Sequence, residues 1–111
     1  MIKSIQNTDH YNWRVNCDGW HLLKSDTLSV IQERMPHNSK EQLHYHQFEQ
    51  QVFYILSGTA TFEINGQEHV VSAFESIHLP KKTVHRIFTD RDRTFQIRGT
   101  IPSQKIHRKR F

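Results

Sequence analysis

Cysteine, proline and glycine are scarce in this sequence of 111 residues, which contains one, three and four of them respectively. The single cysteine, Cys17, excludes an internal disulfide and favours a reducing compartment. No apolar run approaches the ~18 residues that suggest a membrane span. The N-terminal stretch MIKSIQNTDH also lacks the apolar core of a signal peptide. We therefore predict a soluble cytoplasmic protein without a membrane segment.

The net charge of +4 is concentrated at the C-terminal end of the chain. Four basic side chains lie within the last seven residues: Lys105, Arg108, Lys109 and Arg110. Without this end the chain is nearly neutral, and short basic ends that lack apolar anchors usually stay solvated. We interpret residues 104–111 as a basic tail, and the balance of charge disfavours nucleic acid as the main partner.

Hydrophobic residues make up 35% of the chain, which is low for a helical bundle. The clearest local signal is the stretch TATFEINGQEHVV. Here Ala60, Phe62 and Ile64 alternate with polar residues, as in a strand with one buried face. Asn65 and Gly66 tolerate the positive φ angles of a two-residue type I′ turn, so we predict a β-hairpin around them.

Further segments have strand composition and are separated by short turns. They cover residues 20–24, 28–35, 51–57, 75–79, 84–89 and 94–101. No convincing amphipathic helix is visible, and the polar stretch HNSKEQ at 37–42 is predicted to be a loop. This spacing is typical of a β-sandwich or β-barrel, and the chain length supports one domain.

The chain contains nine histidines, two of which, His44 and His46, lie one residue apart in HYHQFEQQ. Residues i and i+2 of a strand point to the same face, so these two imidazoles can hold one ion together. A metal site requires several neutral imidazoles that converge at about 2.0–2.1 Å from the ion. The pair alone is a weak signal for such a site.

The segment from residue 38 to residue 89 resembles the cupin family, whose fold is a double-stranded β-helix or jelly-roll barrel. The two stretches that carry the resemblance are HYHQFEQQVFYILSG and FESIHLPKKTVHRIFT. The residues that keep the spacing of the two family motifs are His44, His46, Gly58, Pro80 and His85. The resemblance implies an all-β, single-domain cupin barrel over residues 20–103, preceded by an N-terminal strand or arm over residues 1–19.

Several positions depart from the family motifs. The family's glycine and asparagine positions are occupied here by Asn38, Phe74, Lys82 and Thr89. Lys82 must either change the turn or adopt a left-handed conformation that costs about 1–2 kcal/mol. The family's glutamate position, counted back from Gly58, falls on Gln51.

The resemblance implies a divalent metal ion bound by His44, His46, Gln51 and His85. Fe, Mn, Ni and Zn are all candidates, because imidazole nitrogens suit several of these ions. An amide ligand carries no charge, so Gln51 would leave the ion its full positive charge. We therefore expect the barrel to bind a small anionic molecule.

Glu49 is the alternative to Gln51 as the ligand beside the histidines. It lies two residues earlier, about 6.5 Å along an extended chain, so the two side chains cannot take one position. Glu49 is also the best candidate for a general acid or base, by proximity alone. We expect Phe53 to face the interior with Gln51 and to line the ligand pocket with Glu49, while Tyr54 faces away.

The other histidines do not fall at matched positions, and an ordinary surface or core role is assigned to His10, His21, His37, His69 and His107. Strand alternation leaves two readings for His78, which faces either the solvent or a polar mouth of the barrel. We favour the solvent face.

Cupins include metal-dependent dioxygenases, isomerases, decarboxylases and ligand-sensing domains, so the fold alone does not give the reaction. The first hypothesis is a small metal-binding cupin that acts on its ligand as a dioxygenase or isomerase. The alternatives are a non-catalytic small-molecule-binding or sensor cupin and a metal-free isomerase with a histidine base. Exposed sheet edges favour a homodimer, in which the strand near Trp13 crosses to the partner.

Overall fold

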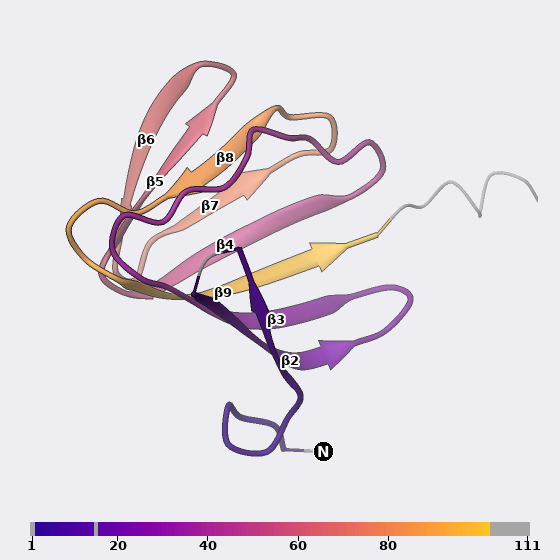
Figure 1. Cartoon of the computed structure of the whole chain (residues 1–111). Helices are drawn as coiled ribbons and strands as arrows, with labels where there is room; N and C mark the ends of the chain where they lie inside the picture. Colours follow the sequence, from indigo (N-terminus) through magenta and orange to yellow (C-terminus); the bar gives the residue numbers. More distant parts are fainter. Residues whose placement is uncertain (1, 15, 103–111) are drawn as a thin grey trace, which may run out of the picture.

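The computed structural model describes residues 2–14 and 16–102, and within them it contains β-strands and no helix (Figure 1). The strands are β1 (His10–Trp13), β2 (Cys17–Lys24), β3 (Ser29–Met35), β4 (Gln50–Ser57), β5 (Thr59–Ile64), β6 (Gln67–Ser72), β7 (Ser76–Leu79), β8 (His85–Phe88) and β9 (Thr94–Ile101). The predicted basic tail at 104–111, with His107, lies outside the described residues. Nothing in the described part of the chain is a helix with the length and hydropathy to cross a membrane.

The strands form two antiparallel sheets, which confirms the predicted all-β cupin-type fold. The larger sheet has the strand order β1-β2-β3-β9-β4-β7, and the smaller sheet has the order β6-β5-β8. Figure 1 shows β5, β6 and β8 in the upper part of the view, with β2, β3 and β9 below them. The strand at 94–101 has the predicted bounds, whereas β2 begins at Cys17 and not at residue 20.

The hairpin predicted between β5 and β6 is present. Asn65 and Gly66 have φ angles of 50° and 84°, as a type I′ turn requires. Strand β5 supplies Ala60 and Phe62, which are fully buried, and the Phe62 ring packs at 5.0 Å from that of Phe53 on β4. The core therefore lies between the two sheets and closes one part of the barrel.

Strand β4 has the predicted alternation of buried and exposed side chains. Gln51, Phe53 and Ile55 are buried, whereas Val52 and Tyr54 are exposed on the outer face. The predictions that Phe53 faces the interior with Gln51 and that Tyr54 faces away are confirmed. A buried glutamine next to a phenylalanine means that the interior is only partly apolar.

Strand β9 directs its polar residues inward. Its buried side chains include Thr94, Gln96 and Thr100, whereas Ile101 is exposed on the opposite face. These buried polar side chains form hydrogen bonds inside the barrel. For example, Thr94 Oγ1 donates to Gln96 Oε1 at 3.0 Å. The barrel interior thus contains a polar region beside the apolar core, where a ligand can be recognised.

The family's glycine positions keep a left-handed backbone although other residues occupy them. Asn38, Phe74 and Lys82 have φ angles of 57°, 69° and 67°. The turn at Lys82 is therefore retained, and its N–H donates to the carbonyl of His46 at 2.7 Å. The left-handed conformation is costly for side chains with a Cβ, and a bulky residue such as Phe74 is an outlier there.

Replacing Phe74 by glycine should raise the free energy of unfolding by about 1 kcal/mol, because the left-handed conformation costs a non-glycine residue about 1–2 kcal/mol. Little packing is lost, since Phe74 is 75% exposed. Urea denaturation of the two proteins measures the difference. Val70→Gly is the matched control, because Val70 is also exposed but lies in a regular strand, and it should destabilise the protein. A loss of stability in Phe74→Gly would contradict this prediction.

Candidate metal centre

His44 and His85 are placed opposite each other by a pair of backbone hydrogen bonds. The N–H of His44 donates to the carbonyl of His85 at 3.0 Å, and the N–H of His85 donates to the carbonyl of His44 at 2.8 Å. His46 follows on the same segment, and the bond from Lys82 holds its carbonyl. These contacts join the histidine-rich loop before β4 to the start of β8.

The three imidazole rings form one cluster, as the resemblance implied. The ring centroids of His44 and His85 lie 4.4 Å apart, those of His44 and His46 lie 5.2 Å apart, and those of His46 and His85 lie 5.8 Å apart. One potential ligand atom from each residue lies within 4.8 Å of the others. A shared ion at about 2.0–2.1 Å requires nitrogens roughly 3–4 Å apart, and the separations of up to 4.8 Å in this cluster are close to that requirement.

The same nitrogen is engaged on each ring, which fixes the direction of the other one. The Nδ1 atoms contact the carbonyls of Gln42 and Thr83 at 2.7 and 2.9 Å and the carboxylate of Glu49 at 3.2 Å. Because carbonyl and carboxylate oxygens accept, Nδ1 carries the proton and Nε2 keeps its lone pair. His85 is 2% exposed, and its buried Nε2 has no hydrogen-bond partner among the described residues. This donor set fits a divalent metal ion.

Burial favours the neutral, metal-binding form of two of the imidazoles, those of His46 and His85. It lowers the pKa of His46, and the nearby His44 and Arg98 lower it further against the opposing charge of Glu49. Burial is also the main reason that the pKa of His85 is lowered, although its bond to Thr83 acts in the opposite direction. A lowered pKa means that these rings stay neutral to lower pH than an ordinary histidine.

We expect the protein to retain a bound metal ion as the pH falls below about 6.5, the ordinary histidine pKa. Only neutral imidazole binds, and the lowered pKa values of His46 and His85 postpone protonation to lower pH. Acid titration of the Co²⁺-loaded protein, followed by its visible absorption, measures the midpoint of release. Metal loss centred above pH 7 would be inconsistent with this environment.

Gln51 and Glu49 occupy different places. Gln51 is 4% exposed and faces the interior, where its Nε2 donates to Thr100 Oγ1 at 3.2 Å. The carboxylate of Glu49 lies beside Nδ1 of His46, the nitrogen that faces away from a metal bound through Nε2. Glu49 therefore supports the His46 ring, and Gln51 as a metal ligand stays a prediction.

Several polar residues of the interior were not predicted from the sequence. They are Tyr11, Glu33, Glu41, Gln96 and Arg98. Glu41 Oε1 accepts the N–H of Ile87 at 3.1 Å, and burial raises the pKa of its carboxyl against the charge of His44. The alternation of polar residues along 94–101 could have indicated the interior positions of Gln96 and Arg98 on β9, but the sequence contains no such signal for the other three residues. His78 is exposed and contacts Gln50 at 2.9 Å, so its predicted solvent position is confirmed.

A family model for the cupin domain matches residues 30–97, which is more than half of the chain. The chain therefore belongs to the cupin family. This result agrees with the two-sheet fold and with the cluster of His44, His46 and His85.

Two curated proteins are similar to part of the chain. An uncharacterized protein of Methanocaldococcus jannaschii is 28% identical over 67 residues, which cover 60% of this chain and 54% of that protein. The quercetin 2,3-dioxygenase of Bacillus subtilis is 29% identical over 73 residues, which cover 66% of this chain and 22% of that enzyme. The chain thus spans about half of the first relative and about a fifth of the second.

Solved structures match over nearly the whole chain. KdgF from Halomonas sp. has a TM-score of 0.84 at 14% identity, with 96% of this chain and 99% of that chain covered. A predicted oxalate decarboxylase of Thermotoga maritima has a TM-score of 0.81 at 18% identity, with 92% and 99% covered. At these identities the likeness shows the fold alone.

Proposed function

We propose that the chain is a metal-binding cupin that holds one divalent ion through His44, His46, His85 and Gln51 and binds a small anionic molecule beside it. The observation that carries this proposal is the buried Nε2 of His85, which lacks a protein partner in the described structure. Such a nitrogen is costly unless something satisfies it. The two neighbouring imidazoles make a metal ion the suitable group.

The donor set also determines the charge of the site. Three neutral imidazoles and one amide leave a divalent ion its full charge, whereas a glutamate would cancel part of it. When bound, the ion supplies a Lewis acid that polarises an oxygen of the ligand. His44, His46 and His85 position it, and Glu49 orients the His46 ring by facing its Nδ1.

Titration of the Co²⁺-loaded protein with acetate and with acetamide tests the proposal. Both probes have similar size, but only acetate carries a negative charge. We expect acetate to change the visible absorption of bound Co²⁺ at concentrations at least tenfold lower than acetamide, because the site keeps an uncancelled charge. Failure to bind Co²⁺, or equal responses to the two probes, would contradict the proposed function.

A dioxygenase activity is the candidate reaction favoured by the likeness to quercetin 2,3-dioxygenase. The match covers only 22% of that enzyme, so quercetin as a substrate of this chain is a proposal. Oxygen uptake by the iron-, manganese- or nickel-loaded protein in the presence of quercetin tests it. Ligand binding without oxygen uptake would favour the alternative of a non-catalytic binding or sensor cupin.

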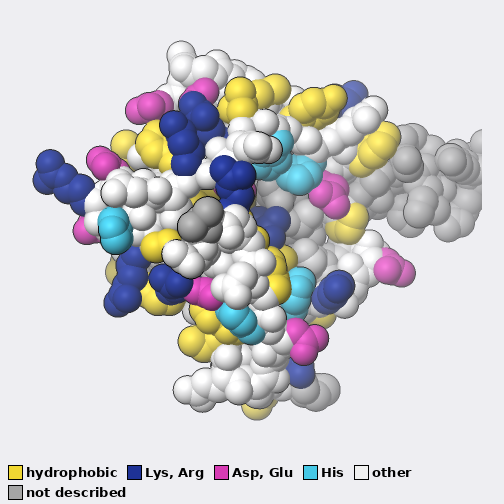
Figure 2. Space-filling view, in the orientation of Figure 1, with side chains coloured by type: hydrophobic (Ala, Val, Ile, Leu, Met, Phe, Trp, Pro, Cys, Tyr) yellow, Lys and Arg dark blue, Asp and Glu magenta, His cyan; other side chains and the backbone are white. Residues whose placement is uncertain are grey.

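The predicted homodimer stays a proposal, as does the cytoplasmic location. The homodimer is supported by apolar side chains on the outer face of the large sheet, where Val52, Tyr54 and Ile101 are exposed. In the chain as described, β1 pairs with its own β2, and the exchange of this strand between subunits remains a prediction. Figure 2 shows basic and acidic side chains interspersed on one face, which gives no support there to a nucleic-acid surface.

A further inference from the structure

The barrel interior contains an ion pair that the proposed metal site does not use. Glu33 on β3 is 3% exposed, and its Oε2 lies 3.0 Å from Nε of Arg98 on β9. Its other oxygen accepts a hydrogen bond from Gln96 Nε2 at 3.0 Å. Although burial alone would lower the pKa of Arg98, the charge of Glu33 helps to hold that pKa above its usual value. The guanidinium is therefore a fixed positive charge inside the barrel.

The side-chain donors of Arg98 are only partly used. Its Nε lies 3.0 Å from Glu33 Oε2 and is taken up by the ion pair, so the terminal nitrogens are the donors left for a ligand. Its Nη2 makes one long hydrogen bond, to the hydroxyl of Tyr11 at 3.4 Å. Guanidinium has five N–H donors in a planar fork that suits a carboxylate. Arg98 thus has unused capacity for an anionic ligand.

Tyr11 reaches Arg98 because Gly19 leaves space for its ring. A Cβ at Gly19 would lie 2.4 Å from the Tyr11 ring, and the ring also stacks on that of His21 at 4.9 Å. Tyr11 belongs to the edge strand β1, so its position depends on how firmly β1 is attached to β2. The hydroxyl of Tyr11, on the edge strand β1, is thereby brought into contact with the Arg98 side chain of β9.

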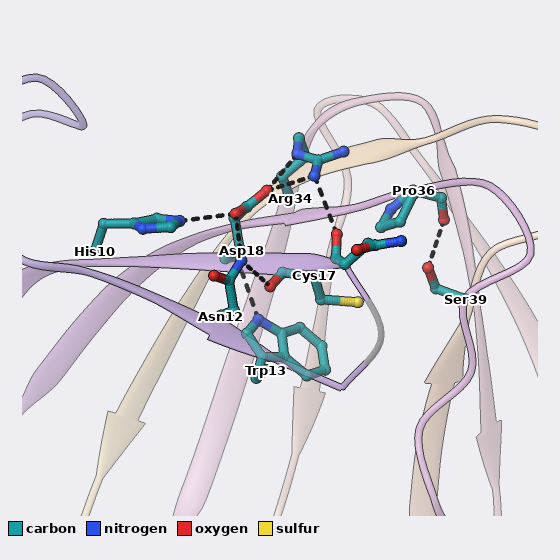
Figure 3. Close-up of polar contacts among 9 residues, drawn as sticks. His10, Asn12, Trp13, Cys17, Asp18, Arg34, Pro36 and Ser39 are labelled. Carbon is teal, nitrogen blue, oxygen red and sulfur yellow. Dashed lines mark hydrogen bonds and ion pairs between the residues drawn. The ribbon is translucent and has the colours of Figure 1, made fainter.

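The opposite face of β1 is held by a polar network (Figure 3). The carboxylate of Asp18 accepts hydrogen bonds from Asn12 at 2.9 Å and Arg34 at 2.6 Å and contacts His10 Nε2 at 2.7 Å. His10 and Asn12 flank Tyr11 in sequence and therefore point to the other side of the strand. This outer network fixes the strand so that the Tyr11 side chain is directed inward.

Arg98 lies on the same interior face as the candidate metal site. It is two residues from Thr100 on β9, about 7 Å along the strand, and Thr100 is the hydrogen-bond partner of Gln51. Its charge also acts on His46, whose pKa it helps to lower after burial and the effects of Glu49 and His44. A short molecule can therefore contact the metal site and the guanidinium at the same time.

We propose that Arg98, supported by Tyr11, binds a carboxylate of the ligand while the metal site binds its other end. This inference rests on the proposed metal-binding function. It specifies the ligand class as short molecules with two acidic groups, or with one carboxylate and a second oxygen donor. Glu33 competes with the ligand for Arg98 and thus sets the strength of this second contact.

Calorimetric titration with succinate and with butyrate tests the inference. The two probes have the same chain length, but butyrate has a methyl group where succinate has its second carboxylate. We expect the protein to bind succinate at least tenfold more tightly than butyrate. Arg98→Met should reduce this preference to about twofold or less, because the variant lacks the fork that binds the second carboxylate.

A second pair of variants separates ligand binding from a structural role. Arg98→Met alone leaves Glu33 buried and unpaired, so the double variant with Glu33→Gln keeps the interior neutral and should show the same lost preference. Glu33→Gln alone should tighten succinate binding several-fold, because it removes the competing carboxylate. If the Glu33–Arg98 ion pair had only a structural role, Glu33→Gln would not tighten succinate binding.

Arg86→Met is the matched control, since Arg86 neighbours His85 on β8 but pairs with Glu63, at 2.7 Å. It should keep the preference for succinate. An unchanged preference in the folded double variant, or no tightening in Glu33→Gln, would overturn the inference. Absence of Co²⁺ binding would instead count against the metal site, and calorimetry would still report whether the preference for succinate depends on Arg98.

Discussion

Replacing His44 and His85 together by alanine should abolish stoichiometric metal binding, with a loss of affinity well above 100-fold. Removal of a group that only supports a metal ligand already costs about 10–100-fold, and this double variant removes two ligands themselves. The two residues face each other across one backbone bridge, and His85 also supplies the buried Nε2 that lacks a hydrogen-bond partner among the described residues. Competition with a chromogenic chelator measures the change.

The control for this prediction is His78→Ala. His78 is exposed on β7, where its Nε2 contacts the Gln50 side chain at 2.9 Å, so metal affinity should stay unchanged. Circular dichroism should show that the double variant retains its β-structure. Wild-type affinity in the folded His44→Ala, His85→Ala protein would remove the site altogether.

Replacing Gln51 by glutamate should tighten metal binding by about tenfold or more and weaken the binding of carboxylate ligands by a similar factor. A carboxylate is a stronger, charged donor for a divalent ion, and it cancels part of the charge that attracts an anion. Gln51 is buried on the interior face of β4, so the new carboxylate has little access to solvent. Metal competition and acetate titration of both proteins measure the two effects.

Glu49 provides the contrast to Gln51. Glu49→Gln should change metal affinity little, because the new amide oxygen can still accept from Nδ1 of His46. Glu49→Ala removes that acceptor and should weaken binding by about tenfold, in the range found for groups that support a metal ligand. If Glu49→Gln strips the metal while Gln51→Glu does not tighten it, the ligand is Glu49 and not Gln51.

Much of the fold could be predicted because its signals are local. The alternation of β4, the Asn65–Gly66 turn and the strand at 94–101 each follow from a pattern of neighbouring residues. The histidine cluster required the resemblance to cupins, since His85 lies far from His44 in sequence. Spacing alone does not place two such residues across one backbone bridge.

The polar interior could not be predicted, because period-2 alternation does not say which face of a strand is inside. The usual expectation puts the apolar face inward, but on β9 the buried Gln96 and the half-buried Arg98, which pairs with the buried Glu33, lie on the interior face. Tyr11 was missed for another reason. Its interior position depends on the absence of a Cβ at Gly19 and on the network around Asp18, both of which are contacts between strands.

The turn at Lys82 illustrates a third limit. The missing glycine left open whether the turn changes or the residue accepts strain, and the observed φ of 67° decides for strain. The hydrogen bond from Lys82 to the carbonyl of His46 gives a reason, because this turn joins the two segments that carry the histidines. Sequence composition alone contains no information about that bond.

Elemental analysis of the purified protein after reconstitution with Fe, Mn, Ni or Zn, compared with His44→Ala, is the most direct test of the metal site. We predict about one divalent ion per chain in the unmodified protein, since the three imidazoles share one site, and almost none in the variant. Metal content that is absent from the unmodified protein with every ion, or equal in the two proteins, would contradict a metal centre on these histidines.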